Sequence, residues 1–224
     1  MEKDDQRVSR TGFEFSPEAV ILGGGDFPTH EIPLAFITHT HRFVCCDGAA
    51  NQCHALALSP WRVIGDGDSL SSDARRRYAD CIRTFPDQET NDQTKAVHYL
   101  KHKGFRRIAI VGATGRREDH TLGNVSLLME YAKEGLEVRI YTDSGVFLAC
   151  EDDTSFTCRK GTAVSVFSFG TQGMTSEGLA YPLYDFTTWW QGTLNHTTAN
   201  TFHIHCTGRY LVYLAYENLK ERKD

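Results

Sequence analysis

The chain has 224 residues and a mass of 25.2 kDa, which corresponds to one large domain or two small ones. Hydrophobic residues make up 40% and charged residues 24%, as in ordinary globular proteins, and the formal net charge is -5. This acidic balance, without a block of Lys or Arg, argues against a broad nucleic-acid footprint and against binding to anionic membrane surfaces.

The first twelve residues are polar, and no apolar run approaches the roughly 18 residues that a membrane span needs. Seven cysteines, an odd number without a C-x-x-C pair, are typical of reduced thiols. We therefore expect a cytoplasmic protein that does not associate with membranes. His203, His205 and Cys206 form an H-x-H-C cluster. We interpret this cluster as structural, because the sequence offers no further ligands to complete a metal site.

Short apolar runs alternate with helical patterns over the first two thirds of the chain. The runs predict strands at residues 19–22, 43–47, 62–66, 81–85, 106–113 and 136–143. Residues 90–103 have helical spacing, which places Ala96, Val97 and Leu100 on one apolar face. Strands that alternate with helices predict a parallel sheet with helices packed on it.

The pattern changes near residue 145, where helical spacing gives way to apolar runs separated by Gly, Asp and Thr. These runs predict strands at residues 145–150, 155–158, 163–169, 200–206 and 209–216. The predicted fold is therefore an α/β domain over residues 1–144, followed by an all-β domain, a small sandwich or roll, over residues 145–224.

Acidic and glycine-rich segments follow five of the predicted parallel strands. They are GGGD (23–26), DGAAN (47–51), GDGDS (65–69), DQETND (87–92) and TGRREDH (114–120). Ligands of an open parallel sheet bind beyond the carboxyl ends of its strands. A single carboxylate at a strand end is ordinary turn chemistry, but five such segments at one edge predict a binding site.

Asp66 and Asp68 are two residues apart, so in an extended segment they point to the same side with Cα atoms about 6.6 Å apart. Carboxylates in this arrangement repel each other unless a cation lies close to them. Mg²⁺ is usually held by one or two carboxylates together with substrate phosphates. The agreement with Asp47 and Asp92 favours a metal loop over the alternative that D-G-D is only a turn.

Two segments could hold a phosphate at this edge. Thr90-x-x-Gln93 fits a capping box, which predicts Asp92 and Lys95 in the first turns of a helix that begins at the same edge. Lys95 would then clamp a phosphate or simply pair with Asp92. The glycine turn at 23–25 is the second candidate cradle. The dinucleotide and P-loop patterns G-x-G-x-x-G and G-x-x-x-x-G-K-[ST] are both absent, so the residues predict a Mg²⁺-dependent phosphate site of another kind.

Seven motifs, taken in order, resemble those of the thiamine pyrophosphokinase family. They are GGGDFP (23–28), CDGAAN (46–51), GDGDSL (65–70), DQETNDQTKAV (87–97), GATGRREDHTLGN (112–124), SEGLAYPL (176–183) and GTLN (192–195). The resemblance implies a Rossmann-like α/β domain followed by a β-sandwich. It implies a reaction that moves the terminal pyrophosphate of ATP to the hydroxyl of thiamine, giving thiamine diphosphate and AMP. It also implies a homodimer in which thiamine lies between the α/β domain of one subunit and the β domain of its partner.

The resemblance and the residue pattern together give the candidate site residues. The acidic cluster around Mg²⁺ and the ATP phosphates consists of Asp47, Asp66, Asp68 and Asp92, of which Asp66, Asp68 and Asp92 are the expected metal ligands. The expected contacts on the nucleotide side are Gly24, Gly25, Asn51, Ser69, Lys95, Arg117, Asp119 and His120. The expected contacts on the thiamine side are Gln88, Ser176, Trp189, Trp190 and Asn195. The two tryptophans enter because thiamine is a flat cation that an aromatic face would hold, although each could equally be a core or hairpin aromatic.

Two positions depart from the family pattern. Leu194 precedes Asn195 where many relatives have serine, and Gly67 occupies the middle of the G-D-x-D motif, where animal relatives often have an aromatic residue.

Several functional questions stay open at the level of sequence. Asp92 or Asp68 would take the proton of the alcohol, and the pattern does not choose between them. A pyrophosphokinase or kinase for another small alcohol, such as a pterin, is one alternative. A module that senses a nucleotide or thiamine without turnover is another, and it would release no AMP.

Overall fold

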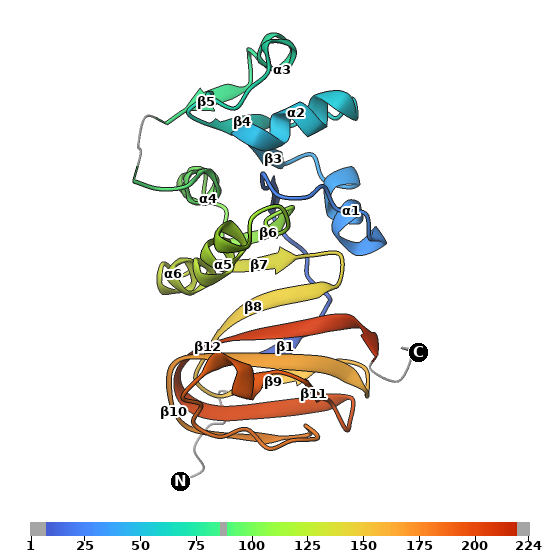
Figure 1. Ribbon diagram of the computed structural model, residues 1–224, viewed down its shortest axis with the longest axis vertical. Helices are drawn as coiled ribbons and strands as arrows, with labels where there is room; N and C mark the ends of the chain where they lie inside the picture. Colours follow the sequence, from blue (N-terminus) through green and yellow to red (C-terminus); the bar gives the residue numbers. More distant parts are fainter. Residues whose placement is uncertain (1–7, 86–88, 219–224) are drawn as a thin grey trace. The chain divides into compact units, whose positions relative to one another are not determined.

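The computed structural model describes residues 8–85 and 89–218, which form two compact units (Figure 1). One unit spans residues 16–143, and the other combines residues 8–15 with residues 144–218. The boundary between residues 143 and 144 lies close to the boundary expected after residue 144. Residues 8–15 differ from the expectation, because they form β1 (Val8–Thr11), which pairs in parallel with β9 (Thr154–Thr157) of the later unit. The sequence of β1, VSRT, has no apolar alternation that could have predicted a strand there.

The unit at residues 16–143 is built on a sheet of six parallel strands, as the alternating pattern predicts. Across the sheet the order is β7, β6, β2, β3, β4, β5, and every neighbouring pair is parallel. The strands are β2 (Ala19–Leu22), β3 (Phe43–Cys46), β4 (Arg62–Gly65), β5 (Ile82–Thr84), β6 (Arg107–Val111) and β7 (Glu137–Tyr141). β2 and β3 are buried throughout, which explains why their sequences AVIL and FVCC show no alternation.

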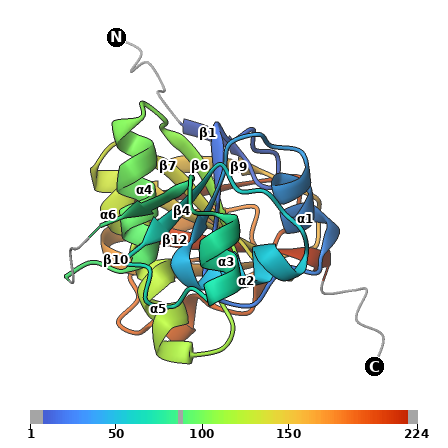
Figure 2. The ribbon, with the colours of Figure 1, turned by 90° about the horizontal axis from the view of Figure 1, so that it is seen from above.

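Helices cover both faces of this sheet. They are α1 (Glu31–Thr38), α2 (Asp47–Ala55), α3 (Ser72–Arg77), α4 (Asp92–His102), α5 (Glu118–Ser126) and α6 (Leu128–Lys133). In Figures 1 and 2, α1 and α2 lie on one side of the sheet, and α4 and α6 lie on the other. Within the described residues, no helix is both long and apolar enough to cross a membrane.

Helix α4 confirms the apolar face predicted from its spacing, since Ala96, Val97 and Leu100 are fully buried. The predicted start is wrong by one residue. The N-cap is Asn91, whose side-chain oxygen accepts a hydrogen bond from the backbone N–H of Thr94 at 2.9 Å. A short amide acceptor at this position satisfies a free N–H of the first turn without a capping box.

The strand order reverses between β2 and β6, and ligands of open α/β sheets bind at the carboxyl edge beside such a reversal. The glycine turn after β2 fits tightly against the segment after β6. The N–H groups of Gly23 and Gly25 donate to the carbonyls of Val111 and Gly112 at 2.8 Å. A β-carbon on Gly25 would lie 2.2 Å from the carbonyl oxygen of Thr114. Close packing of the backbone therefore requires glycine here.

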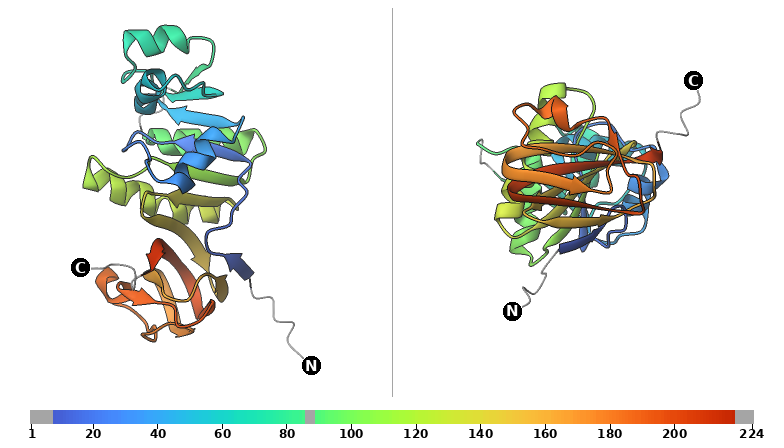
Figure 3. Two further views of the ribbon diagram at one scale, coloured as in Figure 1. Left: turned by 90° about the vertical axis from the view of Figure 1, so that its right-hand side faces the viewer. Right: turned by 90° about the horizontal axis from the view of Figure 1, so that it is seen from below.

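The unit that contains residues 144–218 confirms the predicted all-β texture. Its elements after β1 are β8 (Gly145–Glu151), β9 (Thr154–Thr157), β10 (Thr162–Glu177), the 3₁₀-helix η1 (Trp189–Gly192), β11 (Asn195–His196) and β12 (Thr201–Asn218). The long strand β12 pairs in antiparallel fashion with β10 along one edge and with β8 and β9 along the other (Figure 3). The two strands predicted at 200–206 and 209–216 are thus one strand. Gly208, at φ +108°, lets the chain continue between them, and its carbonyl accepts a bond from the N–H of Asp152 at 2.9 Å.

Cross-strand pairs hold β9 to β12. Phe156 and Phe202 lie opposite each other with stacked rings 4.6 Å apart. On the other face, His203 Nδ1 lies 2.7 Å from the hydroxyl of Ser155. His205 shares that face, as the H-x-H spacing predicts, with its ring 6.5 Å from that of His203. Pairs of this kind stabilise neighbouring strands.

Candidate active site

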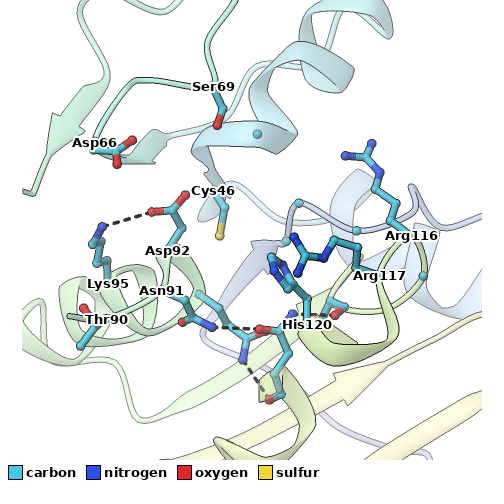
Figure 4. A pocket seen from close by; sticks show the side chains of 18 of the residues that line it. Cys46, Asp66, Ser69, Thr90, Asn91, Asp92, Lys95, Arg116, Arg117 and His120 are labelled. Carbon is cyan, nitrogen blue, oxygen red and sulfur yellow. Dashed lines mark hydrogen bonds and ion pairs between the residues drawn. The ribbon is translucent and has the colours of Figure 1, made fainter. Parts of the chain in front are cut away.

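A cavity of about 690 Å³ lies in the parallel unit, at the carboxyl edge of the sheet (Figure 4). Ligands of open α/β sheets bind at this edge, where the strand order reverses. The lining comes from the segments at residues 23–25, 46–51, 66–69, 90–95 and 113–124. The structure thus brings together the segments that the sequence places after five separate strands.

The two sides of the cavity carry opposite charges. Figure 4 shows Asp66, Asp92 and Lys95 on one side, and Arg116, Arg117 and His120 on the other. On the acidic side, Lys95 Nζ lies 3.4 Å from Asp92 Oδ1, and the lysine side chain is only 7% exposed. The pair predicted from the i, i+3 spacing is therefore present, and it is largely shielded from water.

Asp47 lies behind this acidic side, in the first turn of α2, and is almost fully buried. A β-carbon on Gly65 would lie 2.4 Å from Asp47 Cβ and 3.3 Å from Asp92 Oδ2. Burial raises the pKa of Asp47, and the neighbouring Asp92 carboxylate raises that pKa further. Burial likewise raises the pKa of Asp92. The ion pair with Lys95 lowers this pKa in part, and repulsion from Asp66 raises it. The ionised form of Asp47 is thus disfavoured by Asp92, and that of Asp92 by Asp66.

The G-D-G-D-S segment is anchored to α2. The N–H of Ser69 donates to Asp47 Oδ2 at 3.2 Å. Asn51 holds the next turn at two points, since its Nδ2 donates to the carbonyl of Ser69 at 2.8 Å and its Oδ1 accepts from the N–H of Ser71 at 2.9 Å. Asn51 and Ser69 both line the cavity, and Asn51 also fixes the shape of the segment.

The expected metal ligands do not all meet in the cavity. Asp66 and Asp92 line it, but Asp68 is exposed and lies outside the lining. The backbone N–H of Asp68 instead donates to Asp66 Oδ1 at 3.1 Å, which lowers the pKa of Asp66. In residues 8–85 and 89–218, no three His, Cys, Asp or Glu side chains are gathered closely enough to hold a metal ion by themselves.

Two carboxylates in the lining nevertheless fit Mg²⁺, which takes few protein ligands when substrate phosphates supply the rest. The buried Oδ1 of Asp47 has no hydrogen-bond partner among the described residues. A bound cation would offset both this orphaned charge and the repulsion between the neighbouring carboxylates.

The basic side of the cavity surrounds the start of α5. Arg117, the N-cap residue, makes two hydrogen bonds to Asp119, from Nε to Oδ1 at 3.1 Å and from Nη2 to Oδ2 at 2.6 Å. Arg117 and His120 line the cavity, but Asp119 does not. This pairing lowers the pKa of Asp119. Asp119 therefore holds the arginine side chain from outside the lining.

The sequence interpretation missed several lining residues. They are Cys46, Gly48, Thr90, Asn91, Gln93, Ala113, Gly115, Arg116 and Asn124. Asn91 and Gln93 both donate to Asn124, at 3.0 Å to its side chain and 3.1 Å to its carbonyl. All three lie within the recognised motifs, but Gln93 and Asn124 lie inside α4 and α5 rather than directly after a strand, so strand-end chemistry does not identify them. The glycine turn does line the cavity, but the N–H of Gly25 is already bonded, so only Gly24 remains open as a cradle residue.

Ser176 and Asn195 shape the backbone of the antiparallel unit. The hydroxyl of Ser176 accepts from the N–H of Leu183 at 3.0 Å. Asn195 is only 4% exposed, and its amide bonds both backbone groups of Tyr181, accepting from the N–H at 3.1 Å and donating to the carbonyl at 2.6 Å. Both residues thus hold the segment that carries Tyr181.

The two tryptophans of η1 differ in their surroundings. Trp189 donates from Nε1 to the carbonyl of Ser168 at 3.3 Å and contacts the rings of Phe167 and Phe169. Trp190 is 73% exposed. Trp189 is also exposed, at 48%, as are the large hydrophobic side chains of Tyr181, Tyr184 and Leu194 in this unit. Gln88, the remaining expected contact, lies outside the described residues.

Two family models match the chain. One is described as "Thiamin pyrophosphokinase, catalytic domain" and covers residues 35–140, and the other as "Thiamin pyrophosphokinase, substrate-binding domain" and covers residues 145–213. The thiamine pyrophosphokinase of Bacillus subtilis is 32% identical over 128 residues, which are 54% of this chain and 58% of that protein. Thiamine pyrophosphokinase 1 of Arabidopsis thaliana is 30% identical over 118 residues, 42% and 44% of the two chains. The chain spans about half the length of the curated relatives that it matches.

Solved structures show the same fold. Thiamin pyrophosphokinase from Candida albicans superposes with a TM-score of 0.77 at 15% identity, covering 97% of this chain and 95% of that chain. The Bacillus subtilis enzyme has a TM-score of 0.73 at 18% identity, covering 88% and 99%. The cavity lies in the unit that matches the catalytic model, and the antiparallel strands match the substrate-binding model. The chain therefore belongs to the thiamin pyrophosphokinase family.

Proposed function

We propose that this protein transfers pyrophosphate from ATP to thiamine. In this reaction the hydroxyl oxygen of thiamine attacks the β-phosphorus of ATP, and the bond from that phosphorus to the oxygen of the α-phosphate breaks. AMP leaves with the electron pair of the broken bond, and the hydroxyl proton passes to a base. The products are thiamine diphosphate and AMP.

The observation that carries this proposal is the division of one cavity into an acidic and a basic side. Arg116, Arg117 and His120 face Asp66 and Asp92 across the cavity (Figure 4). The basic side suits the anionic nucleotide, and the acidic side suits a cation bound to its phosphates. Phosphoryl transfer asks a protein mainly for positioning and charge neutralisation, which such an arrangement supplies.

Asp66 and Asp92 would hold Mg²⁺, and Asp47 would support them from behind. When bound, Mg²⁺ neutralises charge on the phosphates. Lys95 adds a fixed positive charge beside Asp92. Asp68 is not included in this set, because its side chain does not line the cavity.

Asp92 is a better candidate than Asp68 for the base that takes the thiamine proton. It lines the cavity, where a bound alcohol could come within hydrogen-bond reach, and Asp68 does not. The N-terminal turn of α4 and the ion pair with Lys95 hold its side chain in place.

The antiparallel unit would bind the thiamine ring, with Trp190 as the aromatic surface. We propose further that the parallel unit is a Rossmann-like domain, that the antiparallel unit is a β-sandwich, and that the protein is a cytoplasmic homodimer whose thiamine site lies between subunits. The exposed Trp190 supports the first part of this assignment, because aromatic faces attract flat cations.

Incubation with ATP, Mg²⁺ and a panel of vitamin alcohols, followed by nucleotide analysis, tests the proposal. We expect AMP to form only with thiamine and only with a divalent metal. AMP formed with a pterin alcohol instead would identify another pyrophosphokinase. Binding of ATP and thiamine without AMP would identify a sensor.

A further inference from the structure

We propose that Arg75, a residue of α3 outside the cavity lining, is a positioning residue that fixes the metal loop, defined as residues 65–71, before a cation binds. This inference rests on the proposed function, because it concerns how the same acidic side is held. The guanidinium of Arg75 donates from Nη2 to the carbonyl oxygen of Gly67, the residue between Asp66 and Asp68.

Gly67 is the point at which the metal loop most needs an external contact. Its φ of +89° lies in the left-handed region that side chains disfavour, so glycine is the residue that fits there. The same freedom makes glycine costly to order, because glycine loses more conformational entropy on folding than any other residue. Within the metal loop, the Gly67 carbonyl accepts only a long bond from the N–H of Leu70, at 3.4 Å.

The guanidinium occupies the space beside Gly67 that a side chain would fill. The three heavy atoms nearest to a β-carbon built there are Arg75 Nη1, Nη2 and Cζ, at 3.4, 3.5 and 3.9 Å. Gly67 itself is buried although both of its aspartate neighbours are exposed. Arg75 thus provides both a hydrogen bond and van der Waals contact at the centre of the metal loop.

The other anchors of the metal loop come from α2. Asp47 and Asn51 bind the backbone of Ser69, and Asn51 also binds that of Ser71. Arg75 is itself held by its helix, which starts with an N-cap bond from Ala74 N–H to Ser71 Oγ at 3.2 Å. A cation site is pre-organised only if the backbone on both sides of its ligand is fixed. On this side of the loop Asp47 of α2 interacts with the backbone N–H of Gly67, and Arg75 binds the carbonyl of the same residue.

The neighbouring residue Arg76 provides a matched control. It is also an exposed arginine of α3, but its guanidinium pairs with Asp73 on the same helix. Arg76→Ala therefore removes the same charge and side-chain volume without changing a contact of the metal loop.

Hydrogen exchange of the metal-free protein gives a readout that does not depend on activity. In Arg75→Ala, the amides of Asp68, Ser69 and Leu70 should exchange about tenfold faster, the factor that corresponds to losing one charged hydrogen bond. Amides in β2 should not change, and Arg76→Ala should match the wild type throughout. Unchanged exchange at residues 68–70, or an equal increase over the whole of residues 16–143, would overturn the proposal.

Metal titration provides the second readout. In Arg75→Ala, the Mg²⁺ concentration for half-maximal activity should rise about tenfold while kcat at saturating Mg²⁺ stays near the wild-type value, because the loop must then be ordered when the cation binds. Arg75→Lys should fall between the two, since an ammonium can donate to Gly67 but lacks the planar group. A loss of kcat with unchanged metal dependence would contradict a positioning role. If the protein does not act on thiamine at all, the exchange experiment still decides the role of Arg75.

Discussion

Gly65 and Asp47 lie so close together that a β-carbon on Gly65 would be 2.4 Å from Asp47 Cβ, nearer than real side chains approach. Gly65 ends β4, and Asp47 begins α2 directly after β3. Because glycine has no side chain, the Asp47 carboxylate after β3 can lie against the backbone at the end of β4. The acidic side of the cavity is built around this contact.

The substitution Gly65→Ala should therefore damage both stability and activity. The added methyl group meets Asp47 Cβ and lies 3.3 Å from Asp92 Oδ2, so the two acidic segments must move apart. We expect a loss of about 1–3 kcal/mol in the free energy of unfolding, typical of overpacking. Denaturant unfolding measures this loss. Gly48→Ala is the control, because a β-carbon there would have no neighbour within 4 Å, and equal effects of the two substitutions would contradict the account.

Much of this arrangement could be predicted from the sequence, because strand burial and edge chemistry leave clear signals. Buried runs such as AVIL and FVCC identify the parallel strands, and carboxylates directly after them identify the edge. The sequence could not place Asp68 outside the cavity. Residues i and i+2, such as Asp66 and Asp68, point to the same side only in an extended segment. Gly67, which lies between them, has a positive φ, so the segment is not extended there. The assignment of Gln88 stays a prediction.

The raised pKa values of Asp47 and Asp92 predict how stability depends on pH. A carboxyl with a raised pKa in the folded state contributes stability that is fully present below its unfolded pKa, about 3.9, and is lost as the pH rises through the folded value. Asp47→Asn removes the ionisable group and with it this loss of stability at higher pH. The asparagine keeps an oxygen that can accept the hydrogen bond from the N–H of Ser69. The variant should therefore melt above the wild type at pH 7.5, and the difference should shrink toward pH 4.5.

Asp66→Asn is the matched control for this measurement, because the N–H of Asp68 lowers the pKa of Asp66. The pKa shift of Asp66 is opposite in sign to that of Asp47, so Asp66→Asn should not raise the melting temperature at pH 7.5. An Asp47→Asn variant that melts below the wild type at neutral pH would show that the buried carboxylate stabilises the metal-free fold.

Asp119 should affect nucleotide binding through Arg117. Because Asp119 holds the guanidinium with two hydrogen bonds but does not line the cavity, Asp119→Ala should raise the KM for ATP severalfold with a smaller change in kcat. Arg117→Ala should raise it at least as much, and the double variant should resemble Arg117→Ala. Steady-state kinetics decide between these outcomes. Fully additive effects would mean that the two residues act independently.

The two adjacent tryptophans should separate binding from stability. Trp190 is 73% exposed, so Trp190→Ala should raise the KM for thiamine and leave the melting temperature nearly unchanged. Trp189 packs on Phe167 and Phe169, so Trp189→Ala should lower the melting temperature by several degrees. Calorimetry and thiamine titration of both variants test this division. The sequence could not make it, because the residues are neighbours of one type and only their surroundings differ.

The most direct test of the central claim is to follow both products of one reaction with ATP, thiamine and Mg²⁺. The account predicts AMP and thiamine diphosphate in equal amounts, and a loss of both by about two orders of magnitude or more in Asp92→Asn. The Asp92→Asn protein should melt no lower than the wild type at pH 7.5, which shows that a loss of activity is not a loss of folding. The appearance of ADP and thiamine monophosphate instead would contradict pyrophosphate transfer, and full activity of Asp92→Asn would contradict the assignment of this cavity as its site.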